Sequence, residues 1–161
     1  GGIIVETEAY SWKERGCHAY EGKKTARNAT MFDAGGCCYV YLCYGMYNLL
    51  NVVTNTEGKA EAVLIRAIEP NRGIDTMRER RKVKNDKQLT SGPGKLTMAL
   101  GITRKQNGIW LQDDEVWIEE GLKVTSKHCI TDKRIGIDYA GEDADLLWRF
   151  YLRDNVWVSK K

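Results

Sequence analysis

The β-forming run at residues 38–54 constrains the fold of this chain more than any other segment. It is rich in tyrosine, valine and leucine, and Gly45 interrupts it. That pattern predicts two strands, at 39–44 and 47–54, joined by a tight turn into a β-hairpin. Because the tip of a hairpin projects from its sheet, Tyr44 is the tyrosine least expected to pack in a core.

Shorter patterns predict a long loop and further strands. The segment 11–30 is polar and rich in glycine and lysine, without a sustained period, which indicates a loop. Apolar or alternating runs indicate strands elsewhere. These strands are expected at 2–10, 60–68, 116–118, 134–137 and 148–152.

Two helices complete the predicted elements. Asn71 or Asp75 can cap a helix that runs to about Lys84. Pro93 suits the first turn of a second helix at 93–100, and the glycine at 101 suits its end. Strands outnumber helices and do not alternate with them, which predicts an α+β fold on an antiparallel or mixed sheet. A length of 161 residues suits one domain, which we expect to span 1–161.

Composition limits the classes of function. A hydrophobic fraction of 42% belongs to a folded protein, and no apolar run reaches the length of a membrane span, so no membrane partner is expected. The five cysteines lack the spacing of a zinc site and indicate free thiols in a reducing compartment. The net charge of +3 is small, yet the basic residues cluster at 23–27, 72–87 and 160–161. Such clusters form either a basic binding face or an ordinary solvated surface.

The first strand carries two carboxylates in an apolar setting, in the stretch VETEAY. Side chains alternate along a strand, so Glu6, Glu8 and Tyr10 share one face. Neighbouring carboxylates can provide a general base or a nucleophile, and the alternative is that both are solvated on an edge strand. In the strand at 60–68, Arg66 has apolar neighbours on both sides. An ion pair with Glu8 and simple exposure to water are equally good interpretations of this arginine.

The tyrosine-rich run at 39–47 indicates a surface for flat ligands. Tyrosine rings beside carboxylates and basic loops are used to stack a nucleobase or to wedge into a base stack. The alternative is core packing and cross-strand pairing. His18 stands alone in the polar loop, where a histidine is more often a surface residue than a catalyst.

Taken in order, these blocks resemble one enzyme family. VETEAY is followed by a loop histidine, TARN with MF, YVYLCYGMYNLLNVV, LIRAIEP, SGPGKL and RFYLRDNVWVS. The order resembles that of the alkyladenine (3-methyladenine) DNA glycosylases of mammals and many bacteria, over about 2–159. The resemblance implies a curved, mostly antiparallel sheet with a protruding hairpin and flanking helices.

The resemblance also implies an activity. Such an enzyme is a monofunctional hydrolase that flips alkylated or deaminated purines, such as 3-methyladenine, 7-methylguanine and hypoxanthine, out of damaged double-stranded DNA. It cleaves the N-glycosidic bond and so starts base excision repair. It works as a monomer inside the cell, with DNA, and needs no metal and no cofactor.

Catalytic roles follow from the resemblance. Glu8, rather than Glu6, is expected to be the general base that activates water. Arg66 is expected to help hold that water, and the main chain at 134–137 is expected to complete the water site.

Substrate-base roles follow in the same way. Tyr10 and Tyr41 are expected to stack on the two faces of the flipped base, and His18 is expected to contact the base and its nucleotide. Asn51 is expected at the pocket floor, where it crowds the exocyclic amine of guanine and disfavours that base.

Other residues are expected to contact the rest of the DNA. Tyr44 matches the family's wedge, which fills the vacated base stack, and Met46 flanks it. Contacts to the DNA backbone are expected from Thr25, Arg27, Asn28 and Lys95.

Three features depart from the family pattern. The loop between Tyr10 and His18 is one residue shorter, and residues 13–17 replace an acidic, alanine-rich run. Ala26 stands where the family has proline. The residues that the family carries before its first strand are absent, so we expect the N-terminal part of the family domain to be missing from this sequence.

Two rival functions remain open on the residues alone. Glu6 and Glu8 lie roughly 6.6 Å apart along a strand, a separation that suits a carbohydrate hydrolase, but they share one side, whereas glycosidase carboxylates flank the bond. A non-catalytic nucleic-acid-binding module would use the tyrosine hairpin as a stacking platform. Replacing Glu8 by glutamine distinguishes an enzyme from such a module.

Overall fold

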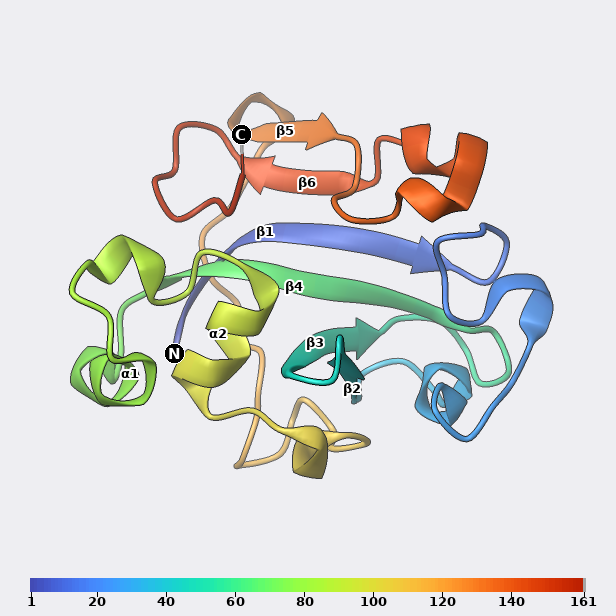
Figure 1. Ribbon diagram of the computed structural model, residues 1–161, viewed down its shortest axis with the longest axis horizontal. Coiled ribbons are helices and arrows are strands. Elements are labelled where there is room, and N and C mark those ends of the chain that lie inside the picture. Colours follow the sequence, from blue (N-terminus) through green and yellow to red (C-terminus); the bar gives the residue numbers. More distant parts are fainter. Residues whose placement is uncertain (161) are drawn as a thin grey trace.

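The protein is built on one six-stranded antiparallel sheet, in the strand order β2-β3-β4-β1-β6-β5. The computed structural model describes residues 1–160. Figure 1 shows β1 and β4 as the two long strands at the centre, with β5 and β6 along one side. The predicted α+β class is confirmed. The strands are β1 (Gly2–Ser11), β2 (Cys38–Cys43), β3 (Tyr47–Val53), β4 (Glu61–Pro70), β5 (Cys129–Asp132) and β6 (Arg149–Leu152).

Two helices pack together on one side of the sheet, and the second of them lies on β3 and β4. They are α1 (Ile74–Arg81) and α2 (Pro93–Leu100), and they lie near the same end of the molecule in Figure 1. Helix α2 begins and ends where its proline and glycine signals predict, and α1 begins after Gly73 instead of at Asn71 or Asp75. A buried core forms between the helices and the sheet, and it includes Val40, Leu50, Ile65, Ile68, Met77, Leu89, Leu96 and Ala99. In residues 1–160, no helix is both long and apolar enough to cross a membrane.

The long loop after β1 packs on the opposite face of the sheet. The predicted loop is confirmed as irregular, although it contains short 3₁₀ turns at Tyr20–Gly22 and Ala29–Phe32. All five cysteines are free, as predicted. The loop and the strands share a second core that includes Cys17, Ala19, Met31, Phe32, Cys37, Tyr39, Val53 and Ala62.

Two of the predicted strands are wrong. Residues 116–118 form only an isolated bridge between Gln112 and Trp117, because no strand within residues 1–160 pairs with them. Residues 134–137 cannot continue a strand, since Gly136 has a φ of +79° and the N–H of Ile135 donates to a side chain. The strand that pairs with β6 is instead β5, a short and partly exposed segment whose alternation is too weak to predict.

Candidate active site

The register of the sheet places a row of mostly polar side chains across the face opposite α1 and α2. Asn51 of β3 pairs with Leu64 of β4, which pairs with Glu8 of β1, which pairs with Arg149 of β6. At one end of this row, Tyr39 of β2 pairs with Asn51. Directly opposed residues in a sheet share a face, so all these side chains project to the same side. Glu8 therefore lies near the middle of the face that the loop after β1 partly covers.

Glu8 is fully buried at the floor of a cleft on this face. Its Oε2 accepts hydrogen bonds from the Tyr10 hydroxyl (2.9 Å) and from Nη1 of Arg66 (3.1 Å). Its Oε1 accepts a hydrogen bond from the main-chain N–H of Ile135 (2.7 Å). A carboxylate offers about four acceptor sites, so the three donors found among residues 1–160 leave room for one more on Oε1.

Glu6 is also fully buried, and its partners differ from those of Glu8. Its Oε1 accepts from Nε of Arg66 (3.1 Å) and Nη1 of Arg149 (3.1 Å), and its Oε2 accepts from the N–H of Ser159 (2.6 Å). The equal alternatives for Arg66 are thus decided in favour of an ion pair, and Arg66 bridges both glutamates. The Ser159 hydroxyl also donates to Oε1 of Glu6 (2.9 Å), so four donors surround this carboxylate. Glu6 therefore acts as an anchor for Arg66 and not as an open catalytic group.

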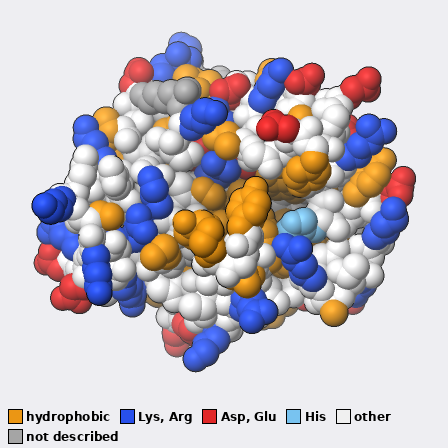
Figure 2. Space-filling view, in the orientation of Figure 1, with side chains coloured by type: hydrophobic (Ala, Val, Ile, Leu, Met, Phe, Trp, Pro, Cys, Tyr) orange, Lys and Arg blue, Asp and Glu red, His pale blue; other side chains and the backbone are white. Residues whose placement is uncertain are grey.

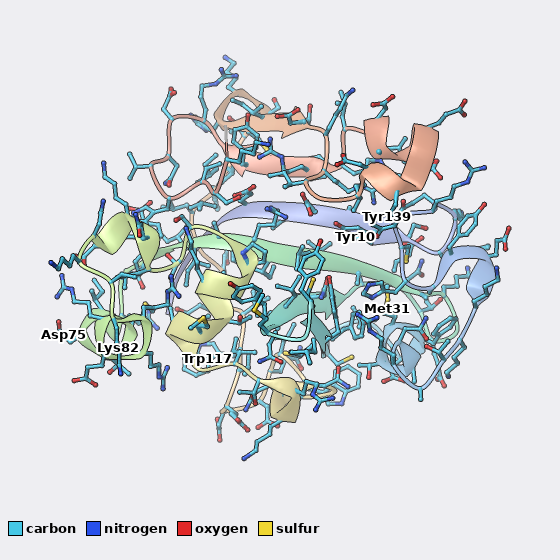
Figure 3. The ribbon with its side chains drawn as sticks, in the orientation of Figure 1. Tyr10, Met31, Asp75, Lys82, Trp117 and Tyr139 are labelled. Carbon is cyan, nitrogen blue, oxygen red and sulfur yellow. The ribbon has the colours of Figure 1, made fainter. Side chains whose placement is uncertain are left out.

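Aromatic rings form the walls of the cleft, which encloses about 590 Å³. Tyr10, Tyr41 and His18 line it, and Tyr39 lies 5.4 Å from Tyr41, centroid to centroid. Figure 3 shows Tyr10 beside Tyr139, with Met31 farther away in the turn at Ala29–Phe32; all three line the cleft. Burial, together with the neighbouring Glu8 carboxylate, raises the pKa of Tyr10 above its ordinary value, so its hydroxyl remains a donor to Glu8.

His18 is held by two tyrosines. Its Nδ1 lies 2.9 Å from the Tyr39 hydroxyl, and its ring meets the Tyr41 ring edge-on at 4.5 Å. Desolvation beside these rings, together with the Arg27 guanidinium, lowers the pKa of His18 to about 4, although the residue keeps an exposed side. The imidazole is therefore neutral at physiological pH, when it offers one donor and one acceptor.

The lowered pKa of His18 predicts a dependence of stability on pH. Between its unfolded value of about 6.5 and its folded value of about 4, only the unfolded chain takes up a proton at this residue. The free energy of unfolding should therefore fall as the pH falls through that window, and His18→Gln should lose less stability over it. Urea unfolding at pH 7 and pH 5 measures this, with the exposed His128→Gln as control. An NMR titration of His18 with an ordinary midpoint would contradict the prediction.

The floor of the cleft includes Asn51, which is 4% exposed. Its Nδ2 donates to the carbonyl of Tyr39 (3.1 Å), and a carbonyl can only accept. That bond fixes the orientation of the amide, with Oδ1 directed away from this carbonyl. Asn51 lies in line with Glu8 across the sheet, with Leu64 between them, and its effect on guanine stays a prediction.

The loop at 25–28 differs from its predicted role at one residue. Asn28 is buried: its Nδ2 donates to the carbonyls of His18 (2.8 Å) and Lys23 (2.9 Å), and its Oδ1 accepts from the N–H of Thr25 (2.6 Å). These hydrogen bonds within the loop occupy the side-chain amide, so Asn28 stabilises the loop and does not face DNA. Thr25 and Arg27 remain exposed, and Arg27 lies 5.7 Å from the Tyr41 ring.

The hairpin tip projects from the cleft. Tyr44 is 81% exposed and Met46 66%, and the chain turns through positive φ at Tyr44 (+50°) and Gly45 (+70°). Positive φ at two successive residues gives the turn that matches the twist of a hairpin. Figure 2 shows hydrophobic side chains gathered at the centre of this face, with Lys and Arg side chains on either side. Lys95 is exposed on the first turn of α2.

Several residues of the site carry no signal in the sequence. Arg149 contacts Glu6 from 143 positions away, and Tyr139 lines the cleft from the 3₁₀ segment Asp138–Asp145. A buried ion pair joins Glu14 and Arg134, which are 120 positions apart. The sequence does not predict these contacts, because they form only when the sheet brings distant segments together.

The comparisons with known proteins agree with this geometry. The family model described as methylpurine-DNA glycosylase matches residues 1–156. Three relatives, each provisionally named 3-methyladenine DNA glycosylase, come from Natranaerobius thermophilus (47% identical, covering 97% of this chain and 81% of the relative), Clostridium acetobutylicum (49%, covering 98% and 81%) and Prosthecochloris aestuarii (48%, covering 99% and 75%). The chain therefore belongs to the methylpurine-DNA glycosylase family and is a monofunctional DNA glycosylase, a hydrolase of DNA repair.

Proposed function

We propose that this protein removes 3-methyladenine, 7-methylguanine and hypoxanthine from duplex DNA by flipping the base into the cleft and hydrolysing its N-glycosidic bond. The observation that carries the proposal is the position of Glu8, a buried carboxylate at the floor of a cleft walled by tyrosine rings. A purine fits between such rings, because aromatic faces stack on a base. We propose further that the enzyme acts as a monomer.

The proposed chemistry is a displacement by water at C1′ of the sugar. Glu8 takes a proton from a water molecule at Oε1, the oxygen of the water bonds to C1′, and the bond from C1′ to the purine nitrogen breaks. The departing base takes the bonding electron pair. A base that carries a positive charge from alkylation leaves as a neutral molecule, and the Glu8 carboxylate stabilises the positive charge that develops on the sugar.

The proposed role of Arg66 is to hold Glu8 and the water beside it. Its guanidinium reaches Glu8 through Nη1 and Glu6 through Nε, so its plane is fixed from two directions. Asn51 is proposed to crowd the exocyclic amine of guanine and thus to protect normal bases.

Base release is the direct test of the proposal. Duplex DNA with one hypoxanthine or one 3-methyladenine is incubated with excess protein, and the free base and the abasic strand are quantified. We expect stoichiometric release of the free base, with no strand cleavage before alkali treatment. Absence of release from both substrates under single-turnover conditions would overturn the proposal.

The exposed wedge gives a second test. Flipping costs a few kcal/mol of lost stacking, which the Tyr44 ring is proposed to offset. Tyr44→Ser should lower single-turnover excision by about tenfold, equivalent to about 1.4 kcal/mol. Because the Tyr44 side chain is 81% exposed, the thermal midpoint of the variant should equal that of the wild type. Trp117→Ser is the control, since Trp117 is an exposed ring that lines a separate depression. If Tyr44→Ser lowered the thermal midpoint as clearly as it lowers excision, Tyr44 would be a core residue and not a wedge.

A further inference from the structure

Arg134 joins four segments of the chain behind the cleft. Its Nη1 donates to the carbonyl of Ala9 (3.0 Å) at the end of β1 and to Oε1 of Glu14 (2.7 Å). Its Nη2 donates to Oε2 of Glu14 (2.8 Å) and to the carbonyl of Asp143 (3.0 Å). Glu14 is 2% exposed and Arg134 5%. The pair is therefore a two-point, desolvated ion pair that holds the loop after β1 against the segment before β6.

The Glu14–Arg134 pair lies next to two groups of the proposed site: the main-chain N–H that donates to Glu8, and the ring of Tyr10. Ile135, the next residue after Arg134, donates its N–H to Oε1 of Glu8. The Arg134 guanidinium lies 4.8 Å from the Tyr10 ring and 5.2 Å from the Trp148 ring. A cation over an aromatic face restrains the ring, so Arg134 backs the tyrosine that is proposed to stack on the base.

The loop that leads to His18 depends on the same contacts. Oε2 of Glu14 also accepts from the N–H of Gly16 (2.7 Å), and the Tyr139 hydroxyl donates to the Gly16 carbonyl (3.2 Å). A Cβ atom at Gly16 would lie 2.9 Å from Oε2 of Glu14, so a larger residue here would displace this carboxylate. His18, which is proposed to contact the base, follows Gly16 by two residues. Its position therefore depends on the Glu14–Arg134 pair.

We propose that Glu14 and Arg134 are positioning residues for excision: together they hold the Ile135 N–H against Glu8 and the Tyr10 ring over the flipped base. The inference deepens the proposed function and rests on it. Neither side chain lines the cleft, so the pair acts on the geometry of the reacting groups and not on the contacts to the duplex. A displacement of about 1 Å in such groups can cost as much as a hundredfold in rate.

The first experiment separates the chemical step from DNA binding. Glu14→Gln keeps the size of the side chain but removes its charge, and it should lower the single-turnover rate of hypoxanthine release tenfold or more. Its affinity for a duplex with a tetrahydrofuran abasic analogue, which has no base to stack, should stay within twofold of wild type. Asp145→Asn is the matched control, because it breaks the exposed Lys133–Asp145 pair beside Arg134, and its rate should be unchanged. A parallel loss of affinity in Glu14→Gln, or an unchanged rate, would overturn the proposal.

The second experiment is independent of activity. Amide hydrogen exchange should show faster exchange at Ile135 in Glu14→Gln, with the strand amides of Thr7 and Phe150 unchanged. Arg134→Lys should give the same two effects, and the double variant should lose little more than either single variant, because the two side chains act as one unit. If wild-type protein releases no base, the proposed function fails, while Ile135 protection still decides the positioning role. Unchanged exchange at Ile135, or uniformly faster exchange over the sheet, would overturn that role.

Discussion

Replacing Glu8 by glutamine is expected to lower the single-turnover rate of base release by about 10²–10⁴-fold. Glutamine has nearly the same shape and can still accept hydrogen bonds from Tyr10 and Arg66 through its one carbonyl oxygen. It cannot take a proton from water or stabilise positive charge on the sugar. Binding to damaged duplex should therefore persist while excision is lost, and a rapid-quench assay with a parallel binding titration measures both.

The control for this variant is Glu57→Gln, which changes an exposed glutamate outside the cleft. It should excise at the wild-type rate. If Glu8→Gln also excises at the wild-type rate, Glu8 is not the general base. If neither the wild type nor the variant releases a base but both bind, the chain acts as a nucleic-acid-binding module.

Replacing Glu6 by alanine should have the largest effect on stability. Glu6 is fully buried against Arg66 and Arg149, and removing one partner of a buried ion pair costs about 3–5 kcal/mol because it leaves uncompensated charge. Arg66 keeps Glu8 and Arg149 keeps Asp132, so we expect a value near the lower end, about 3 kcal/mol. In a domain of this size that lowers the thermal midpoint by on the order of 10 °C.

Urea unfolding and calorimetry of Glu6→Ala test this expectation. The control is Asp75→Asn, which removes an exposed partner of Arg78 and should leave the midpoint unchanged, because exposed ion pairs are screened by water. A loss below about 1 kcal/mol in Glu6→Ala would mean that Glu6 does not anchor the arginines.

The parts of the fold that follow from sequence are those with local signals. The hairpin is marked by its β-forming run and Gly45, and α2 by Pro93 and Gly101, because each signal acts on the backbone within a few residues. Alternation also placed Glu6 and Glu8 on one face. It could not separate their roles, since these depend on Arg149 and Ser159, more than 140 positions away.

The remaining parts depend on pairing between distant segments. Strand β5 exists because β6 pairs with it, and residues 116–118 lack such a partner despite a better β-forming composition. Asn28 shows the same limit on a smaller scale: an exposed loop residue in the sequence turns its amide inward once the loop closes on His18. Glu14 and Arg134 have opposite charges, but nothing in their neighbours indicates that they meet.

The central place of β1 in the sheet has a consequence for the order of synthesis. This strand leaves the ribosome before the others, yet its partners β4 and β6 follow some 60 and 140 residues later. The carboxylate pair on β1 stays without its arginines until both have emerged, and Glu6 waits for Ser159 as well. Closing contacts over such distances is slow, so the hairpin and the helices can form early while the acidic centre assembles last. A nascent chain thus completes this carboxylate–arginine cluster only when almost all of these residues have been made.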